Sequence, residues 1–206
     1  MKLILVDINP ALCLAWESAF KDLPDVQIHQ GYFEGIPAFD CMVSPANSFG
    51  LMDGGIDAAI TRFFGIELMY AVQKRIIEDY LGEQPVGTSM IVKTPSDKHP
   101  FLAHTPTMRV PLTITRSDHV YVAMAAMLRE VHQHNLREEQ KINIVACPGL
   151  GTGVGRVPFK EAARQMSLAY KNYLNPPRNI NWNYASERQL QVRYGGDDGH
   201  IIPPEK

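Results

Sequence analysis

The sequence lacks the features that mark several large classes of protein. It has three cysteines in 206 residues, an odd number in apolar surroundings, which argues against a disulfide framework and predicts reduced core thiols. A formal net charge of −2 provides no broad positive field for non-specific nucleic-acid binding, so any nucleic-acid role would have to be local. The apolar run at residues 3–6 ends in Asp7 and is too short for a signal peptide or a membrane span. These absences predict a cytoplasmic protein that does not enter a membrane.

A metal-ligand pattern is also absent. His132 and His134 lie two positions apart on a predicted helix, so their side chains point to different faces. We predict no metal and no other cofactor.

What the sequence does contain is a regular alternation of strands and helices. Apolar runs predict strands at residues 3–8, 26–33, 41–44, 88–93, 101–104 and 142–146. Helical spacing of apolar residues predicts helices at residues 10–23, 56–64, 71–81, 120–134 and 159–174. The strand runs are mostly continuous rather than alternating, which indicates a mostly parallel mixed sheet covered by helices on both faces. The predicted fold class is therefore α/β, with three layers in the order α/β/α.

The composition changes after Pro176-Pro177, where the chain becomes polar. We therefore predict one domain over residues 1–175 and a polar extension over residues 176–206. The extension is expected either to pack as a small hairpin or to fray.

The first stretch that carries chemistry, residues 44–57, leaves a predicted buried strand and enters a helix. A strand end, a glycine-rich loop and a helix amino terminus together form an anion or nucleotide site. Gly54 and Gly55 let the backbone approach a ligand, and the N–H groups of Ile56 and Asp57 lie at the helix start. Alternatively, Asp57 only stabilises the first turn of the helix and Asn47 is only a turn residue.

The second stretch, residues 147–158, has glycine at positions 149, 151, 153 and 155 between a strand and a helix. Such a loop can wrap a diphosphate with its backbone N–H groups. Val154 and Arg156 break the dinucleotide-binding pattern, and the Gly-Lys-Ser/Thr of a P-loop is missing, so hydride transfer and NTP hydrolysis lose support. Because two such loops lie at strand ends of one sheet, we do not expect either loop to be merely a flexible connector.

Together the two loops resemble the macro domain family, up to about residue 174. Asn47 matches the last asparagine of that family's Asn-Ala-Ala-Asn strand end, and Gly54, Gly55 and Asp57 match its Gly-Gly-Gly-Val-Asp loop. The resemblance implies ADP-ribose, free or on a protein, as the partner. It implies these phosphate and ribose contacts: Ala46, Asn47, Gly54, Gly55, Ile56, Gly151, Thr152, Gly153, Val154 and Gly155.

The chain departs from the family pattern at the expected adenine end. Tyr32 stands where the family has an aspartate that accepts the adenine amino group, and Glu34, Tyr32 or Asp7 could replace it. Phe33 stands where the family places a backbone N–H and an apolar contact, so Phe33 and Glu34 are the predicted contacts. The segment Leu3 to Phe20 resembles an addition to the minimal fold.

The resemblance further implies hydrolysis of mono-ADP-ribose from a modified substrate or an ADP-ribose derivative. Asn47 would contact the distal ribose and Asp57 would activate water. The helix amino terminus predicts a low pKa for Asp57, which suits an orienting role or a weak base. The alternatives are a non-catalytic ADP-ribose-binding module, an ADP-ribose 1″-phosphate phosphatase, or a fold kept only for protein contacts.

Overall fold

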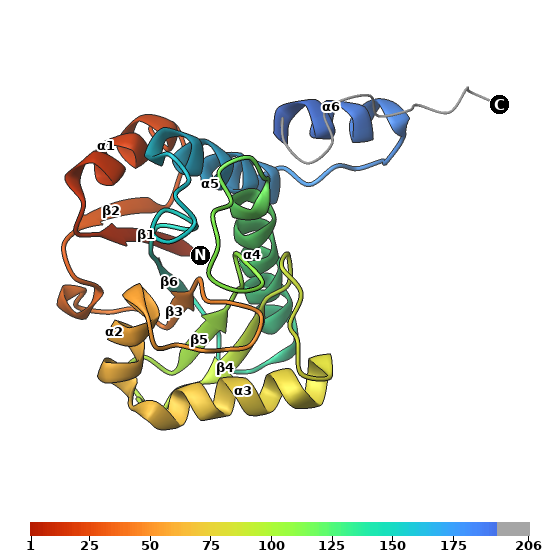
Figure 1. The fold of residues 1–206 in the computed structure, drawn as a ribbon. Coiled ribbons are helices and arrows are strands. Elements are labelled where there is room, and N and C mark those ends of the chain that lie inside the picture. Colours follow the sequence, from red (N-terminus) through yellow and green to blue (C-terminus); the bar gives the residue numbers. More distant parts are fainter. Residues whose placement is uncertain (193–206) are drawn as a thin grey trace.

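The computed structural model describes residues 1–192, which contain six strands, six α-helices and one 3₁₀-helix (Figure 1). In chain order these are β1 (Lys2–Asp7), α1 (Pro10–Ala19), β2 (Val26–Gln30), η1 (Phe33–Gly35), β3 (Cys41–Ser44), α2 (Gly55–Phe64), α3 (Ile66–Tyr80), β4 (Met90–Lys93), β5 (Phe101–His104), α4 (His119–Arg137), β6 (Ile144–Cys147), α5 (Phe159–Leu174) and α6 (Trp182–Val192). None of these helices is long and apolar enough to cross a membrane.

The strands form one sheet in the order β2-β1-β6-β3-β5-β4. Every neighbouring pair is parallel except β4 and β5, which confirms the mostly parallel mixed sheet. β1 pairs with β2 on one side and with β6 on the other. The segment expected to be an addition therefore supplies an internal strand of the sheet.

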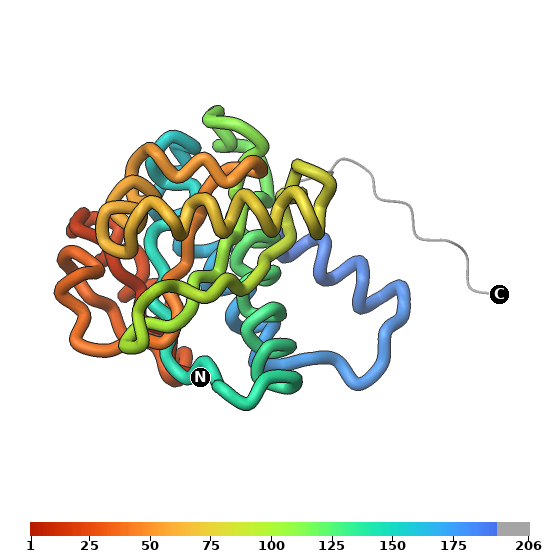
Figure 2. Tube along the Cα trace, turned by 90° about the horizontal axis from the view of Figure 1, so that it is seen from below, coloured from red at the N-terminus to blue at the C-terminus, as the bar shows by residue number. Residues whose placement is uncertain are grey.

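Both faces of the sheet are buried, as the continuous apolar runs predicted. Leu3 and Leu5 of β1 pack under α1, α4 and α5, whereas Ile4 and Val6 belong to the core under α2 and α3. Figures 1 and 2 show these helix groups on opposite sides of the sheet. The three-layer α/β/α class is confirmed.

Some boundaries differ from the sequence-based prediction. α3 begins at Ile66 rather than Ala71, because Gly65 with φ of 95° ends α2 and starts the next helix directly. β2 stops at Gln30 and Phe33 opens the short helix η1, so the second strand is shorter than predicted.

The polar extension contains a helix, not a hairpin, over residues 182–192. α6 lies outside the three layers, beyond α5 (Figures 1 and 2), and Val192 is its buried residue. Arg164 of α5 donates hydrogen bonds to the carbonyl oxygens of Gln191 and Val192, at 2.9 Å each, and so holds the carboxyl end of α6. The glycine- and aspartate-rich stretch at residues 195–199 lies outside the described residues.

The three cysteines, Cys13, Cys41 and Cys147, are all buried and unbridged. Burial raises the pKa of the Cys41 and Cys147 thiols, so they remain protonated. This agrees with the prediction of reduced core thiols.

Candidate functional site

Both glycine-rich loops lie at the carboxyl edge of the sheet, one between β3 and α2 and the other between β6 and α5. A cleft between them has two adjoining parts, with volumes of about 180 Å³ and about 410 Å³. We call the smaller one the β3 half and the larger one the β1 half, after the strands that end beside them. The two halves share Gly55, Ile56, Gly149 and Gly153.

The structure brings every predicted ligand-binding residue to this cleft. The β3 half is lined by Ala46, Asn47, Gly54, Gly55, Ile56, Asp57, Gly151, Gly153, Val154 and Gly155, among others. Phe33, Glu34 and Thr152 line the β1 half. Phe33 is 2% exposed as a whole residue and packs in the core under α2 and α3, so it offers a ligand little surface. Trp182 and Tyr184 line neither half, and the Arg188 guanidinium lies over the Tyr184 ring instead.

The glycines of the second loop have different structural roles. Gly151 has φ of 67°, and a Cβ atom at Gly155 would lie 2.5 Å from the carbonyl oxygen of Gly151. These two glycines therefore permit the tight shape of the loop. A Cβ atom at Gly153 would meet nothing within 4 Å, so this position instead keeps the cleft open.

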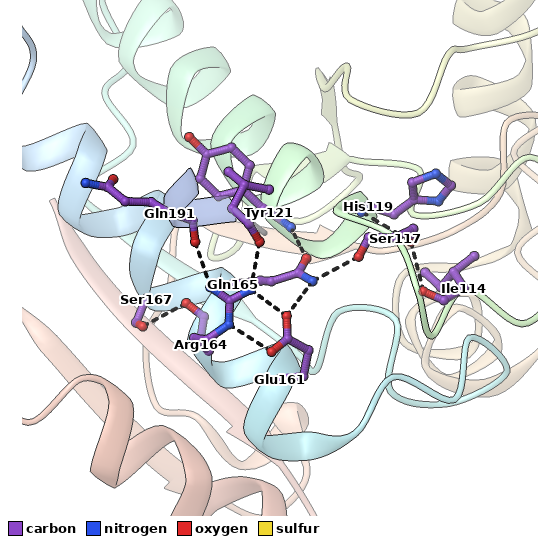
Figure 3. A network of polar contacts seen from close by, with 10 residues as sticks. Ile114, Ser117, His119, Tyr121, Glu161, Arg164, Gln165, Ser167 and Gln191 are labelled. Carbon is purple, nitrogen blue, oxygen red and sulfur yellow. Dashed lines mark hydrogen bonds and ion pairs between the residues drawn. The ribbon is translucent and has the colours of Figure 1, made fainter. Parts of the chain in front are cut away.

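A partly buried polar network, drawn in Figure 3, holds the segment that contacts the second loop. The Ile114 N–H donates to the carbonyl oxygen of Gly155 at 2.9 Å, and the Ser117 hydroxyl donates to the Ile114 carbonyl oxygen at 2.8 Å. The fully buried Gln165 of α5 donates to the Ser117 carbonyl oxygen and accepts from the Tyr121 N–H, each at 2.9 Å. Gln165 thus anchors the turn on which the glycine loop rests.

Asn47 is largely occupied by its own loop. Its side-chain oxygen accepts from the N–H groups of Phe49 and Leu51, at 3.1 and 3.3 Å, and its amide donates to the Leu51 carbonyl oxygen at 2.8 Å. The turn role considered from sequence is therefore present. Asn47 also lines the β3 half, so its contact with a ribose stays a prediction.

The orientation and the pKa of the Asp57 side chain differ from what the sequence predicted. Its side chain turns toward the sheet, where its Oδ1 accepts a hydrogen bond of 2.6 Å from the Ser44 hydroxyl. Burial raises the pKa of Asp57 to about 7, the Ser44 hydrogen bond opposes that shift, and the charge of Asp53 adds to it. The low pKa expected from the helix amino terminus was wrong, because loss of water around the carboxylate outweighs the helix dipole.

The sequence model of the Macro domain family matches residues 43–166, which contain both glycine-rich loops. The chain belongs to the macro domain family. Macro domains are ADP-ribose-binding modules. Among sequence relatives, an uncharacterized protein of Aquifex aeolicus is 36% identical over 143 residues, covering 69% of this chain and 78% of its own length. An uncharacterized protein of Aeropyrum pernix is 31% identical over 130 residues, covering 63% of this chain and 62% of its own length.

Solved macrodomains share the fold of this macro domain. A mutant macrodomain of Oceanobacillus iheyensis with ADPR superposes with a TM-score of 0.55 at 21% identity, covering 79% of this chain and 89% of that one. The macrodomain of Thermus aquaticus DarG gives a TM-score of 0.56 at 20% identity, covering 68% of this chain and 87% of that one. β1, α1 and β2 lie before the segment that the family model matches.

His104 of the macro domain has a structural role. Its Nδ1 lies 2.6 Å from Oε1 of Gln84, whose own side-chain amide donates to the His104 carbonyl oxygen at 3.2 Å. Burial lowers the pKa of His104 to about 3, so the ring is neutral at neutral pH. The Gln84 N–H also donates to the Ser48 carbonyl oxygen, which ties the first loop to this pair.

Charge is distributed unevenly over the cleft. Within the part of the chain that the structure describes, Asp53 and Asp57 are the charged residues lining the β3 half, with no lysine or arginine. The β1 half is lined by Asp7, Glu34 and Arg62. Phosphates in this macro domain would therefore rely on backbone N–H groups and the α2 amino terminus.

Proposed function

We propose that this macro domain binds ADP-ribose in the cleft and hydrolyses the bond that joins the distal ribose to a modified protein or to another group. One observation supports this best: two glycine-rich loops meet across one continuous cleft, and its β3 half contains both Asn47 and Asp57. The shared residues between the halves provide the place for a diphosphate.

In this proposal the ligand lies across both halves. The diphosphate accepts hydrogen bonds from the loop at residues 151–155 and from the N–H groups of Gly55 and Ile56 at the α2 amino terminus. The distal ribose occupies the β3 half beside Asn47. The adenine occupies the larger β1 half, near the backbone of Phe33 and near Glu34.

Asp57 is the proposed general base. A base works best when its pKa is close to the working pH, and burial places the pKa of Asp57 at about 7. The ionised carboxylate accepts a proton from water as the water oxygen forms a bond to the anomeric carbon of the distal ribose. The bond from that carbon to the leaving group breaks, and the leaving group takes the electron pair and is protonated by solvent.

The deciding experiment compares wild type with Asp57→Asn. Asparagine keeps the shape and an oxygen for the Ser44 hydroxyl, but it does not act as a base. Wild type is expected to release ADP-ribose from a mono-ADP-ribosylated protein, and the variant to release it about 100-fold more slowly or worse, because general-base catalysis contributes factors of this order. Calorimetry should show that both proteins bind free ADP-ribose.

A non-catalytic ADP-ribose-binding module is the second candidate. It is favoured by the 9% exposure of Asp57 and by the engagement of the Asn47 side chain within its own loop. Tight ADP-ribose binding without release by wild type would select it, and absence of binding would reject both candidates. The acidic lining of the β3 half disfavours a phosphatase, because a 1″-phosphate there would face Asp53 and Asp57 without a cation.

A further inference from the structure

Ser44 contacts Asp57 from a fully buried position outside the cleft. It is the last residue of β3, its exposed fraction is 0%, and it lines neither half of the cleft. Its hydroxyl donates to Asp57 Oδ1 at 2.6 Å, although the two residues are 13 positions apart. The contact therefore links the end of the strand to the first turn of α2.

This contact replaces the usual arrangement of an acid in a first helical turn. Such an acid commonly faces the free N–H groups of the helix start. In α2 the N-cap residue is Gly54, which offers no side chain, and Asp57 turns inward to β3. A buried carboxylate is costly unless it is hydrogen-bonded, so the Ser44 hydroxyl is what makes the inward orientation tolerable.

The hydrogen bond also gives the two carboxylate oxygens of Asp57 different surroundings. Oδ1 is held by Ser44, whereas within residues 1–192 no group donates to Oδ2. Oδ2 is not among the fully buried unpaired atoms, and Asp57 lines the β3 half. One oxygen is therefore fixed against the sheet and the other is free for a water in the cleft.

We propose that Ser44 is a positioning residue that fixes the Asp57 carboxylate with one oxygen toward the β3 half and favours its ionised form. The catalytic consequence rests on the proposed hydrolase function. No other nearby group stabilises the ionised carboxylate of Asp57 among the described residues. The charge of Asp53 opposes ionisation, His104, which pairs with Ser44 from β5, is neutral, and Arg62 lines the other half of the cleft.

The test uses full-length Ser44→Ala, Ser44→Thr, which keeps the hydroxyl, and Ser48→Ala as a matched control. Ser48 is a buried serine in the loop that follows β3, with an exposed fraction of 1%. The first readout is the titration of the Asp57 side-chain carboxyl carbon by ¹³C NMR, with Asp57→Asn identifying the signal. Loss of a hydrogen bond to the charged form should raise the midpoint in Ser44→Ala by about one pH unit, while threonine restores it and Ser48→Ala leaves it unchanged.

The second readout is turnover of a mono-ADP-ribosylated protein across pH. Ser44→Ala should lower kcat at pH 7 by about 10-fold and move the inflection of the pH profile upward, with KM unchanged. An unchanged NMR midpoint in Ser44→Ala would overturn the proposal. The NMR result decides this even if wild type shows no turnover, which would reject the hydrolase function separately.

Discussion

The carbonyl oxygen of Gly151 lies 2.5 Å from the point that a Cβ atom on Gly155 would occupy. The same Cβ atom would lie 2.9 Å from the Ile114 side chain. Real Cβ atoms do not approach backbone so closely, so the loop in its present shape requires glycine at 155. Gly153, two positions earlier, lines both halves of the cleft and has open space where a Cβ atom would lie. The alternating glycines thus divide into one kind that shapes the loop and another that leaves room for a ligand.

Alanine substitutions should separate these two kinds. Gly155→Ala is expected to destabilise the protein by about 1–3 kcal/mol, the usual cost of overpacking. Gly153→Ala should melt within about 2 °C of wild type, because a surface change is usually near neutral, but should weaken ADP-ribose binding because Gly153 lines both halves of the cleft. Thermal melts and calorimetry measure the two effects. Equal melting temperatures for the two variants would contradict this division.

The local features of the fold could be predicted because their signals are contiguous in the sequence. Continuous apolar runs marked β1 and β3, and α1 begins at the predicted residue 10, where the side chain of the N-cap residue Asn9 accepts from the Ala11 N–H at 3.0 Å. The glycine spacing of both loops marked the cleft edge. Each of these patterns depends on neighbouring residues alone.

The features that were missed depend on contacts between distant residues. Whether Asp57 faces solvent or β3 is decided by Ser44, and the helix-start argument contains no information about that contact. Gln165 of α5 is fully buried against Ser117 and Tyr121, residues more than 40 positions away, and the helical pattern around it does not show this contact. Chain order likewise does not reveal that β1 lies between β2 and β6.

The raised pKa of Asp57, at about 7, predicts a pH-dependent loss of stability. An unfolded aspartate has a pKa of about 3.9. Between these values the unfolded chain releases a proton that the folded chain keeps. The free energy of unfolding therefore falls, by about 1.4 kcal/mol per pH unit for this group, from about pH 4 to pH 7 and is level above that.

Asp57→Asn removes this contribution. The variant should match wild type in stability near pH 4 and become progressively more stable than wild type up to pH 7. Urea unfolding of both proteins at several pH values measures the gap, and Asp97→Asn, which changes an exposed acid outside the cleft, is the control. A gap that does not vary with pH would show that Asp57 is not protonated in the folded protein.

The Asn47 side chain should matter for the shape of the first loop as well as for a ligand. Asn47→Ala removes all three hydrogen bonds to Phe49 and Leu51, each with a net value of about 0.5–1.5 kcal/mol. We expect a lower melting temperature together with weaker ADP-ribose binding. Asn47→Asp keeps the accepting oxygen and should lose less stability than alanine. If alanine weakens binding without changing the melting temperature, the ribose contact alone is responsible.

We predict that Asp7, rather than Glu34 or Tyr32, recognises the adenine of the ligand. All three line the β1 half, but Glu34 and Tyr32 are exposed, Tyr32 by 71%, whereas Asp7 is partly buried at the end of β1. Its Oδ1 accepts from the Asn9 N–H at 2.8 Å, which orients the carboxylate, and its Oδ2 lies next to Gly149, one of the residues shared by the two halves.

Asp7→Asn should therefore weaken ADP-ribose binding by about 10-fold, because a hydrogen bond to a charged group contributes about 1.5–3 kcal/mol. A carboxylate only accepts hydrogen bonds, so wild type should prefer ADP-ribose, which has an amino group on its base, to the hypoxanthine analogue, which has an oxygen there. The variant should lose this preference, and Glu34→Gln should keep it. Calorimetric titration of the three proteins with both ligands measures this, and a preference retained by Asp7→Asn but lost by Glu34→Gln would assign base recognition to Glu34.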